Sequence, residues 1–234
     1  MSTQNGSIVV LENVVKLYRQ GSVEVHALRG LDLHVRKGEF TAISGPSGSG
    51  KTTMLNLVGA LDRPTSGRVV VDGHDLSRMG RSALSRLRRD RIGFVFQAYN
   101  LVPVLTALEN AEIVLALQGI SASRRRERVL ALLAEVGLEG MENRRPDQLS
   151  GGQQQRVAIA RAIAADPAVV LADEPTANVD SETADRLLDL MERLNADKGV
   201  TFIFSTHDPK VMGRARRVVR LVDGRVAGDE SRGP

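Results

Sequence analysis

The segment Gly45–Thr52, with the sequence Gly-Pro-Ser-Gly-Ser-Gly-Lys-Thr, restricts the possible folds more than any other part of the chain. It matches the pattern G-x-x-x-x-G-K-[ST], which requires a strand before it and a helix after it. A short apolar run over 39–44 precedes the segment, and a helical pattern over 52–61 follows it and stops before Pro64. These features predict a strand, a phosphate-binding loop and a helix in an α/β protein.

The residue types of this loop fit a triphosphate ligand. Its glycines let backbone N–H groups converge on phosphate oxygens, and the following helix points its positive N-terminal end at the same place. We expect Lys51 to reach the β- and γ-phosphates, where it serves both binding and catalysis, and the Thr52 hydroxyl to ligate Mg²⁺. The expected nucleotide contacts are Gly45, Pro46, Ser47, Gly48, Ser49, Gly50, Lys51, Thr52 and Thr53.

Apolar patterning predicts strands that alternate with helices along most of the chain. The expected strands cover 7–18, 27–35, 39–44, 68–72, 92–97, 169–172, 201–205, 218–221 and 225–227, and the expected helices cover 52–61, 76–89, 151–165 and 182–195. Residues 105–137 are helical in pattern and poor in strands. The predicted fold is α/β: a P-loop NTPase core with a mainly parallel sheet, an N-terminal antiparallel β subdomain and an inserted α-helical subdomain. We assign the core to 1–97 and 161–234, and the helical subdomain to 98–160.

Composition excludes several classes of protein. The chain has no Cys, which rules out a disulfide framework, thiolate catalysis and Cys-ligated zinc. Its polar start lacks the layout of a signal peptide, and no stretch approaches the ~18 apolar residues of a membrane span. We therefore expect a soluble, cytoplasmic protein that needs a partner for any role at a membrane. The net charge of +4 is consistent with a solvated, Arg-rich surface, and a surface for nucleic acid or anionic lipid is the alternative.

Two adjacent carboxylates, Asp173 and Glu174, follow the apolar run over 169–172. Ligands of open α/β sheets bind beyond the carboxyl ends of the strands. We expect Asp173 to hold Mg²⁺ through water and Glu174 to polarise the attacking water as a general base. Without the phosphate-binding loop upstream, the same pair would indicate only a solvated turn.

The segment 149–156, Leu-Ser-Gly-Gly-Gln-Gln-Gln-Arg, predicts a second anion site. Ser150 fits an N-cap and Gln153 its capping-box partner, at the start of the helix expected over 151–165. Gly151 and Gly152 would expose backbone N–H groups at that helix start. Taken alone, the segment is also consistent with an ordinary capped helix.

The three motifs together resemble the ATP-binding cassette family, and the resemblance covers about Val9 to Gly228. It implies an ATPase that uses ATP and Mg²⁺ and forms a homodimer with a second copy of itself. In the family arrangement two cassettes face head to tail. Each ATP then lies between the phosphate-binding loop of one copy and residues Ser150, Gly151, Gly152 and Gln153 of the other.

Further positions take their roles from this resemblance. Tyr18 corresponds to the aromatic residue that lies against adenine, and a partly buried strand tyrosine is the alternative. Gln97 corresponds to the glutamine that senses the γ-phosphate and helps to ligate Mg²⁺. Asp180 belongs to the loop that crosses the dimer interface, where Val179 replaces the leucine of many relatives. His207 corresponds to a histidine that contacts the γ-phosphate, although a lone histidine after a strand is more often structural.

Several stretches resemble the group that includes the LolD, MacB and FtsE types. They are 93–103, 106–110, 145–150 and 222–225. The resemblance implies an integral membrane permease of the FtsX or MacB type as partner, at the cytoplasmic face of the inner membrane. It implies lipoprotein release, MacB-type export or mechanotransmission as the work done.

Two other functions stay open at this point. One is an FtsE-like regulatory ATPase, which the sequence hardly separates from a transport ATPase. The other is a nucleic-acid-associated cassette ATPase, which is disfavoured because the chain has one cassette and no aromatic and basic platform for bases. We therefore expect no nucleic acid partner. We expect residues 97–112 to form the permease groove, and the arginine runs 86–91 and 124–128 to be solvated or to approach lipid or permease.

Overall fold

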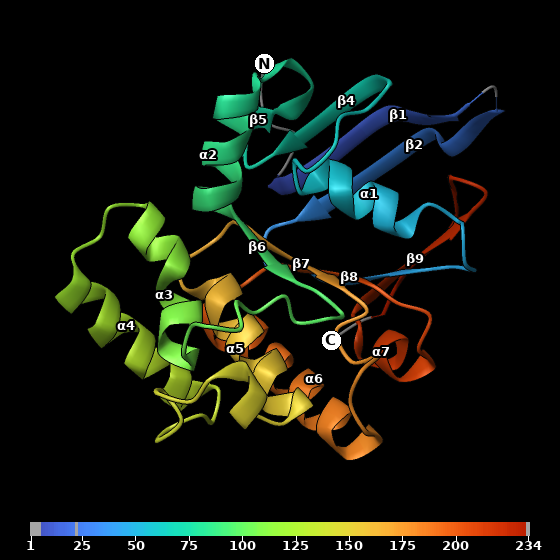
Figure 1. Ribbon diagram of the computed structural model, residues 1–234. Helices are drawn as coiled ribbons and strands as arrows, with labels where there is room; N and C mark the ends of the chain where they lie inside the picture. The colour runs from blue at the N-terminus through green and yellow to red at the C-terminus, as the bar shows by residue number, and fades with distance from the viewer. Residues whose placement is uncertain (1–5, 22, 233–234) are drawn as a thin grey trace.

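The computed structural model describes residues 6–21 and 23–232, which form two sheets with helices packed between and around them (Figure 1). The smaller sheet is antiparallel and has the strand order β2-β1-β4-β5. Its strands are β1 (Ser7–Gln20), β2 (Val23–Arg36), β4 (Ser66–Val71) and β5 (His74–Asp75). This sheet is the antiparallel addition that the N-terminal strand pattern predicts.

The larger sheet has the strand order β10-β9-β3-β8-β7-β6. Its strands are β3 (Phe40–Ser44), β6 (Ile92–Val95), β7 (Val169–Asp173), β8 (Phe202–Ser205), β9 (Arg217–Val222) and β10 (Arg225–Ser231). All neighbouring pairs are parallel except β9 and β10 at the edge. The strands β3 and β8 are buried along their whole length, because layers cover both faces of this sheet. The predicted mainly parallel core is confirmed.

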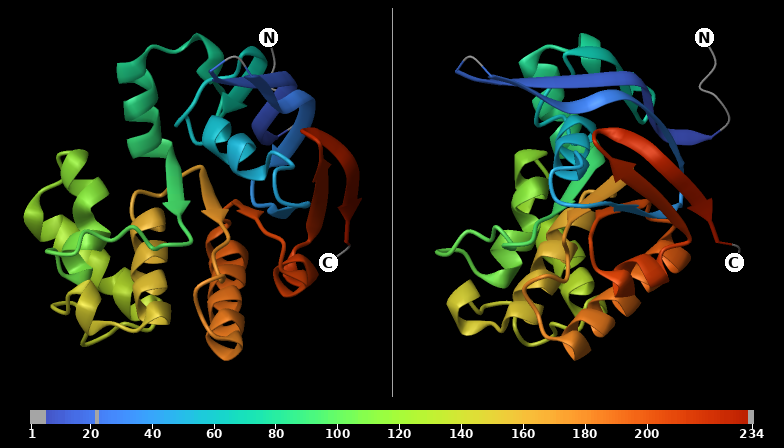
Figure 2. Two further views of the ribbon diagram at one scale, coloured as in Figure 1. Left: turned by 45° about the vertical axis from the view of Figure 1, so that its right-hand side comes forward. Right: turned by 90° about the vertical axis from the view of Figure 1, so that its right-hand side faces the viewer.

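Helices surround the larger sheet on both faces (Figure 2). They are α1 (Lys51–Val58), α2 (Arg81–Arg91), α3 (Ala107–Leu117), α4 (Ala122–Glu135), α5 (Gly151–Ile163), α6 (Ser181–Lys198) and α7 (Pro209–Arg214), with 3-10 turns at Leu76–Arg78 and Pro146–Gln148. α1 packs between the two sheets, α5 and α6 cover the opposite face of the larger sheet, and α3 and α4 lie outside α5. The predicted helical region between 105 and 137 is therefore present as α3 and α4.

Two hydrophobic clusters hold these layers together. One joins the antiparallel sheet, α1 and one face of the larger sheet, and the other joins α3 to α6 to the opposite face. In the second cluster Phe40, Phe202 and Phe204 are fully buried, and the rings of Phe40 and Phe204 meet edge to face with centroids 4.4 Å apart. These clusters fix the carboxyl ends of the parallel strands relative to one another.

Some element boundaries differ from the predictions. The helix expected over 76–89 is two elements, because Gly80 separates the 3-10 turn at Leu76–Arg78 from α2. The helix expected over 52–61 ends at Val58, where Gly59 forms the C-cap. The short strand β5 was not predicted. The domain boundaries at 97 and 160 remain predictions.

Candidate active site

The carboxyl ends of neighbouring parallel strands meet at one cavity of about 690 Å³. β3 leads into the glycine-rich loop, β6 into Gln97, β7 into Asp173 and Glu174, and β8 into His207. The cavity is lined by Tyr18, Val25, His26, Ala27, Gly45, Pro46, Ser47, Gly48, Ser49, Gly50, Lys51, Thr52, Thr53, Gln97, Asp173, Glu174, Ser205 and His207. Every residue of the chain's own predicted nucleotide site therefore borders the same space.

The glycine-rich loop has a shape that only glycine permits at its first position. Gly45 has a φ of 146°, and a Cβ at that position would lie 2.2 Å from the backbone oxygen of Leu221. The Lys51 ammonium donates to the carbonyl oxygens of Gly45 at 2.7 Å and Pro46 at 2.9 Å. The cation is thus held at the mouth of the loop, beside the N-terminus of α1, where both would attract an anion.

Hard oxygen donors lie together next to this loop. The Thr52 hydroxyl donates to Oδ2 of Asp173 at 3.4 Å, and Gln97 borders the same cavity. No group of three or more His, Cys, Asp or Glu side chains suited to a metal occurs in the described part of the chain. One carboxylate, a hydroxyl and an amide fit Mg²⁺, which usually takes few protein ligands and completes its shell with phosphate and water.

Glu174 is held in a strained and defined position. Its φ is 46°, its N–H donates to the carbonyl of Ser205 at 2.9 Å, and its side chain is only 17% exposed. One carboxylate oxygen lies 2.6 Å from Nδ1 of His207, and the other accepts from the Thr206 hydroxyl at 3.2 Å. A half-buried carboxylate fixed in this way, on the wall of the same cavity as the glycine-rich loop, suits a general base.

Gln97 is tied to a loop that lies far away in the sequence. Its amide donates to Oδ1 of Asn178 at 3.4 Å, and the Asn178 amide donates back to the Gln97 carbonyl at 2.9 Å. The Tyr99 hydroxyl donates to the Asn178 carbonyl at 3.0 Å. Asn178 and Tyr99 were not among the predicted site residues, since nothing in their local sequence indicates a contact across 81 and 79 positions.

The second predicted anion site lies outside the cavity. Ser150 caps α5, accepts from the Gln153 N–H at 3.3 Å and completes a capping box with that residue. Asp180 caps α6 by accepting hydrogen bonds from the hydroxyl and the N–H of Thr183, and these bonds lower the pKa of this carboxyl. A Cβ on Gly152 would lie 2.3 Å from Cγ2 of Thr183, so the two helix starts are adjacent. The helix start formed by Ser150, Gly151, Gly152 and Gln153, and Asp180 beside it, are thus absent from the lining of the chain's own cavity.

Two buried hydroxyls in the cavity are unpaired. Within the described residues, neither the Ser49 nor the Ser205 hydroxyl has a hydrogen-bond partner, and both residues are less than 3% exposed. Buried polar groups are normally satisfied, so these hydroxyls are available to a ligand or to water. Ser205 was not among the predicted site residues, because a serine at the end of an apolar strand gives no signal in the sequence.

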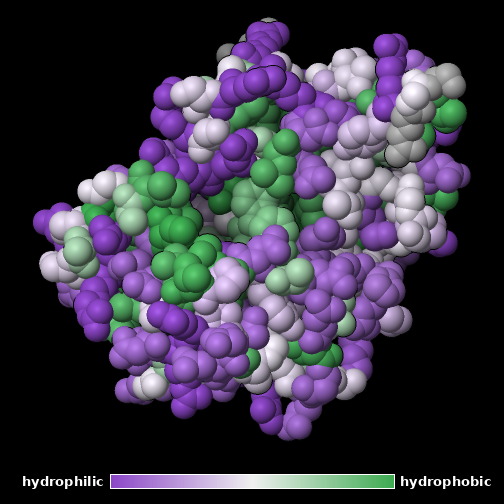
Figure 3. Space-filling model, in the orientation of Figure 1, coloured by the Kyte–Doolittle hydropathy of each residue, from purple (hydrophilic) through white to green (hydrophobic). Residues whose placement is uncertain are grey.

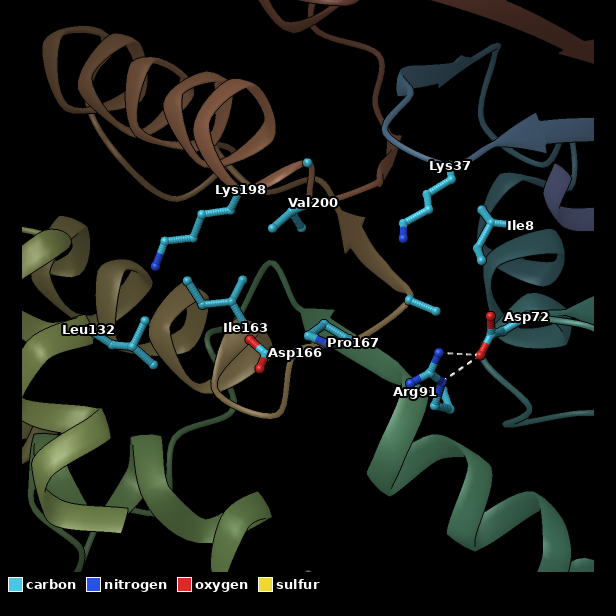
Figure 4. Close-up of a pocket in the computed structure, with 12 residues that line it drawn as sticks. Ile8, Lys37, Asp72, Arg91, Leu132, Ile163, Asp166, Pro167, Lys198 and Val200 are labelled. Carbon is cyan, nitrogen blue, oxygen red and sulfur yellow. Dashed lines mark hydrogen bonds and ion pairs between the residues drawn. The ribbon is translucent and has the colours of Figure 1, made fainter. Parts of the chain in front are cut away.

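Another cavity, of about 370 Å³, lies at the amino ends of the parallel strands (Figure 4). Most of its charged groups are paired: Arg91 with Asp72 at 2.5 Å, Lys198 with Glu135 at 2.6 Å, and Asp166 with Arg128 at 2.5 Å. It contains neither a glycine-rich loop nor a catalytic carboxylate. The chemistry expected for a triphosphate therefore belongs to the cavity at the carboxyl ends.

An apolar groove of about 380 Å³ runs between α2, β6, α3 and α5. Its apolar lining includes Leu61, Phe94, Phe96, Val114 and Leu117, and Leu61 and Leu117 are at least half exposed. Figure 3 shows hydrophobic side chains gathered along α3 and in the hollow towards α2. Contiguous exposed apolar surface of this kind is typical of interaction sites.

Comparison with known proteins gives consistent matches over most of the chain. A family model described as "ABC transporter" matches residues 28–177. The lipoprotein-releasing system ATP-binding protein LolD of Anaeromyxobacter dehalogenans is 51% identical over 94% of this chain and 93% of its own length. The macrolide export ATP-binding/permease protein MacB of Hyphomonas neptunium is 48% identical over 95% of this chain, which spans 34% of that longer protein.

A solved structure matches the fold with a TM-score of 0.89 and 46% identity, over 97% of this chain and all of the other. It is a dimeric post-hydrolysis state of the ATP-binding cassette MJ0796 of Methanocaldococcus jannaschii, bound to ADP and phosphate. Among the residues described for the present chain, no helix combines the length and the apolar character that crossing a membrane requires.

Proposed function

This chain belongs to the ABC transporter family, and we propose that it hydrolyses ATP as a homodimer to drive a separate membrane permease of the LolD and MacB group. One observation carries this proposal. The phosphate-binding loop, both carboxylates, Gln97 and His207 line one cavity, while the capped helix start at Ser150 lies outside its lining. A second copy is therefore needed to bring the two halves of the site together.

The residue roles follow from charge and position. The loop and Lys51 bind the β- and γ-phosphates of one ATP, and Tyr18 lies beside its base. The partner copy supplies the N–H groups of its own residues 150–153 and its own Asp180 across the interface. Donors on both sides of the γ-phosphate stabilise the charge that builds on its equatorial oxygens as the bond to the β-phosphate breaks.

Thr52, Asp173 and Gln97 would hold Mg²⁺, which supplies charge neutralisation at the phosphates when bound. Glu174 accepts a proton from the attacking water, and His207 fixes one oxygen of that carboxylate while remaining exposed towards the γ-phosphate. The Thr206 hydroxyl fixes the other oxygen. This arrangement orients the base before ATP arrives, which is how positioning lowers the barrier to hydrolysis.

The apolar groove between α2, β6, α3 and α5 is the proposed binding site for the permease, at the cytoplasmic face of the inner membrane. It adjoins residues 97–112, and Gln97 connects this segment to the nucleotide cavity. The MacB relative combines an ATP-binding part and a permease in one protein, which supports an FtsX or MacB type of partner. Lipoprotein release, export and mechanotransmission are all consistent with this arrangement.

The proposed function can be tested with a variant that retains ATP hydrolysis but no longer binds the permease. Leu117→Asp places a charge in the groove without touching the nucleotide cavity, so basal ATP hydrolysis should persist while association with the co-expressed permease is lost. Val23→Asp alters another exposed apolar residue and should change neither property. The proposal is wrong if the purified wild-type chain hydrolyses no ATP, or if Leu117→Asp binds the permease normally.

A further inference from the structure

The hydroxyl and the ring of Tyr18 each contact a residue that has no predicted role in nucleotide binding. Its hydroxyl donates to Oδ2 of Asp62 at 2.9 Å. The Lys16 ammonium donates to Oδ1 of the same carboxylate at 2.7 Å and to the carbonyl of Arg63 at 2.9 Å. The ammonium also lies 4.7 Å from the centroid of the Tyr18 ring, within cation–π distance.

This arrangement leaves one face of the aromatic ring for a ligand. Lys16 covers one face, and the ring lies on the wall of the nucleotide cavity together with Val25, its register partner on β2. We propose that Asp62 and Lys16 are positioning residues that hold the Tyr18 ring ready to stack on the base of the nucleotide. This proposal rests on the proposed function, because it concerns the same ATP site.

The energetic reason is preorganisation. An unfastened tyrosine on an exposed strand end samples several rotamers, and ordering it when the base binds costs free energy. The bond to Asp62 and the contact with Lys16 remove part of that cost before the ligand arrives. Because Lys16 covers one face of the ring, the base would stack on the other face, where the ammonium does not compete with it.

The charge states support the same picture at neutral pH. Burial and the hydrogen bond to Asp62 raise the pKa of Tyr18, so the phenol keeps the proton that it donates. Burial opposes ionisation of Asp62, but hydrogen bonds from Lys16, the Arg63 N–H and Tyr18 outweigh it and lower the pKa of this carboxyl. The carboxylate and the neutral phenol are therefore both in the forms that their hydrogen bond needs.

The same contacts would also hold β1 against the segment after α1. The test must therefore distinguish positioning of the Tyr18 ring from general stabilisation of the fold. Inorganic tripolyphosphate has the charges of ATP without its base, and it serves as the second probe. We would measure the Kd of ATP and of tripolyphosphate, each with Mg²⁺, for the wild type, Asp62→Ala and Lys16→Met. Glu24→Gln is the control, because it breaks the exposed pair with Arg19 at the end of the same hairpin without touching the ring.

We expect Asp62→Ala and Lys16→Met to weaken ATP binding about threefold to tenfold, the effect of losing one or two net hydrogen bonds. Tripolyphosphate binding should stay within about twofold of the wild type, since the phosphate-binding loop is intact. In a Tyr18→Ala background, Asp62→Ala should add nothing, because the ring on which it acts is gone.

Three results would overturn the positioning role. They are an unchanged Kd for ATP in Asp62→Ala, an equal loss for ATP and tripolyphosphate, and a full additional loss in the Tyr18→Ala background. If instead the wild-type chain binds tripolyphosphate and ATP equally, the base makes no contribution and this inference fails, while ATP hydrolysis by the chain can still stand. Failure of the wild type to bind ATP at all overturns the proposed function itself.

Discussion

Glu174→Gln changes the charge of the candidate base and little of its shape. The substituted amide can still meet the Thr206 hydroxyl and Nδ1 of His207, which contact the carboxylate at 3.2 and 2.6 Å. The fold should therefore be retained, with the free energy of unfolding changed by about 1 kcal/mol or less. The proton acceptor for the attacking water, however, is lost.

The substitution should slow ATP hydrolysis and should not weaken ATP binding. Positioned general bases contribute on the order of 10²–10⁴ in rate, so kcat should fall by about that factor, or about 3–5 kcal/mol of barrier. ATP affinity should be equal to or slightly tighter than that of the wild type, because one negative charge near the γ-phosphate is removed. The dimer formed with ATP should accordingly become long-lived.

Phosphate release measures the rate, titration with a fluorescent ATP analogue measures the affinity, and light scattering measures the dimer. Glu139→Gln, at an exposed carboxylate after α4, is the matched control and should leave all three unchanged. If Glu174→Gln hydrolyses ATP at more than about a tenth of the wild-type rate, the assignment of the base is wrong.

Three further predictions concern binding, packing and pH. Lys51→Ala removes the cation at the loop mouth and should weaken ATP binding about tenfold to a hundredfold, as titration would show, and unchanged affinity would remove Lys51 from the site. Phe204→Ala empties part of the fully buried aromatic cluster and should cost about 3–5 kcal/mol in denaturant unfolding, and a cost below 1 kcal/mol would contradict the packing. Arg217 lowers the pKa of Asp229 in the folded protein. The ion pair therefore stabilises the fold at a pH above the usual pKa of a carboxyl group, and this stabilisation is lost as the pH falls through the lowered pKa of Asp229. The stability difference between wild type and Asp229→Asn, below about 1 kcal/mol at this partly exposed pair, should therefore vanish in acid, and a difference that grew in acid would refute it.

The site residues were easiest to predict from the sequence where several of them are consecutive in the chain. Two such segments are Gly45–Thr52 and the pair Asp173 and Glu174. Each directly follows the apolar residues of a strand, and parallel neighbouring strands place both segments at the same edge of the sheet. The recognition of an ABC family ATPase is confirmed for this reason, and so is the predicted α/β fold. The individual site roles remain predictions to be tested.

Contacts between distant segments could not be predicted in this way. Asn178 meets Gln97 only because β6 and β7 are neighbours in the sheet. Asp62 meets Tyr18 only because the segment after α1 leads into β4, which pairs with β1. Side chains such as these have no local pattern that separates them from ordinary polar surface. The break at Gly80 is of the same kind, because the helical pattern over 76–89 continues through a position that the fold uses as a cap.

We propose that each ATP site is shared between two copies, and mixing two defective variants tests this sharing. Lys51→Ala damages the phosphate-binding loop, and Gly151→Asp places a carboxylate beside phosphate at the helix start that the partner would use. Each variant alone should hydrolyse little ATP. In a mixed dimer with head-to-tail symmetry, both defects fall in one site and the other site is intact.

Equal mixing should therefore restore hydrolysis to about a quarter of the wild-type rate if mixed dimers form at random and sites act independently. Restoration that requires both variants, and that increases with the fraction of mixed dimers, is the predicted result. A mixture that stays as inactive as its components, although mixed dimers are shown to form, would contradict the shared site.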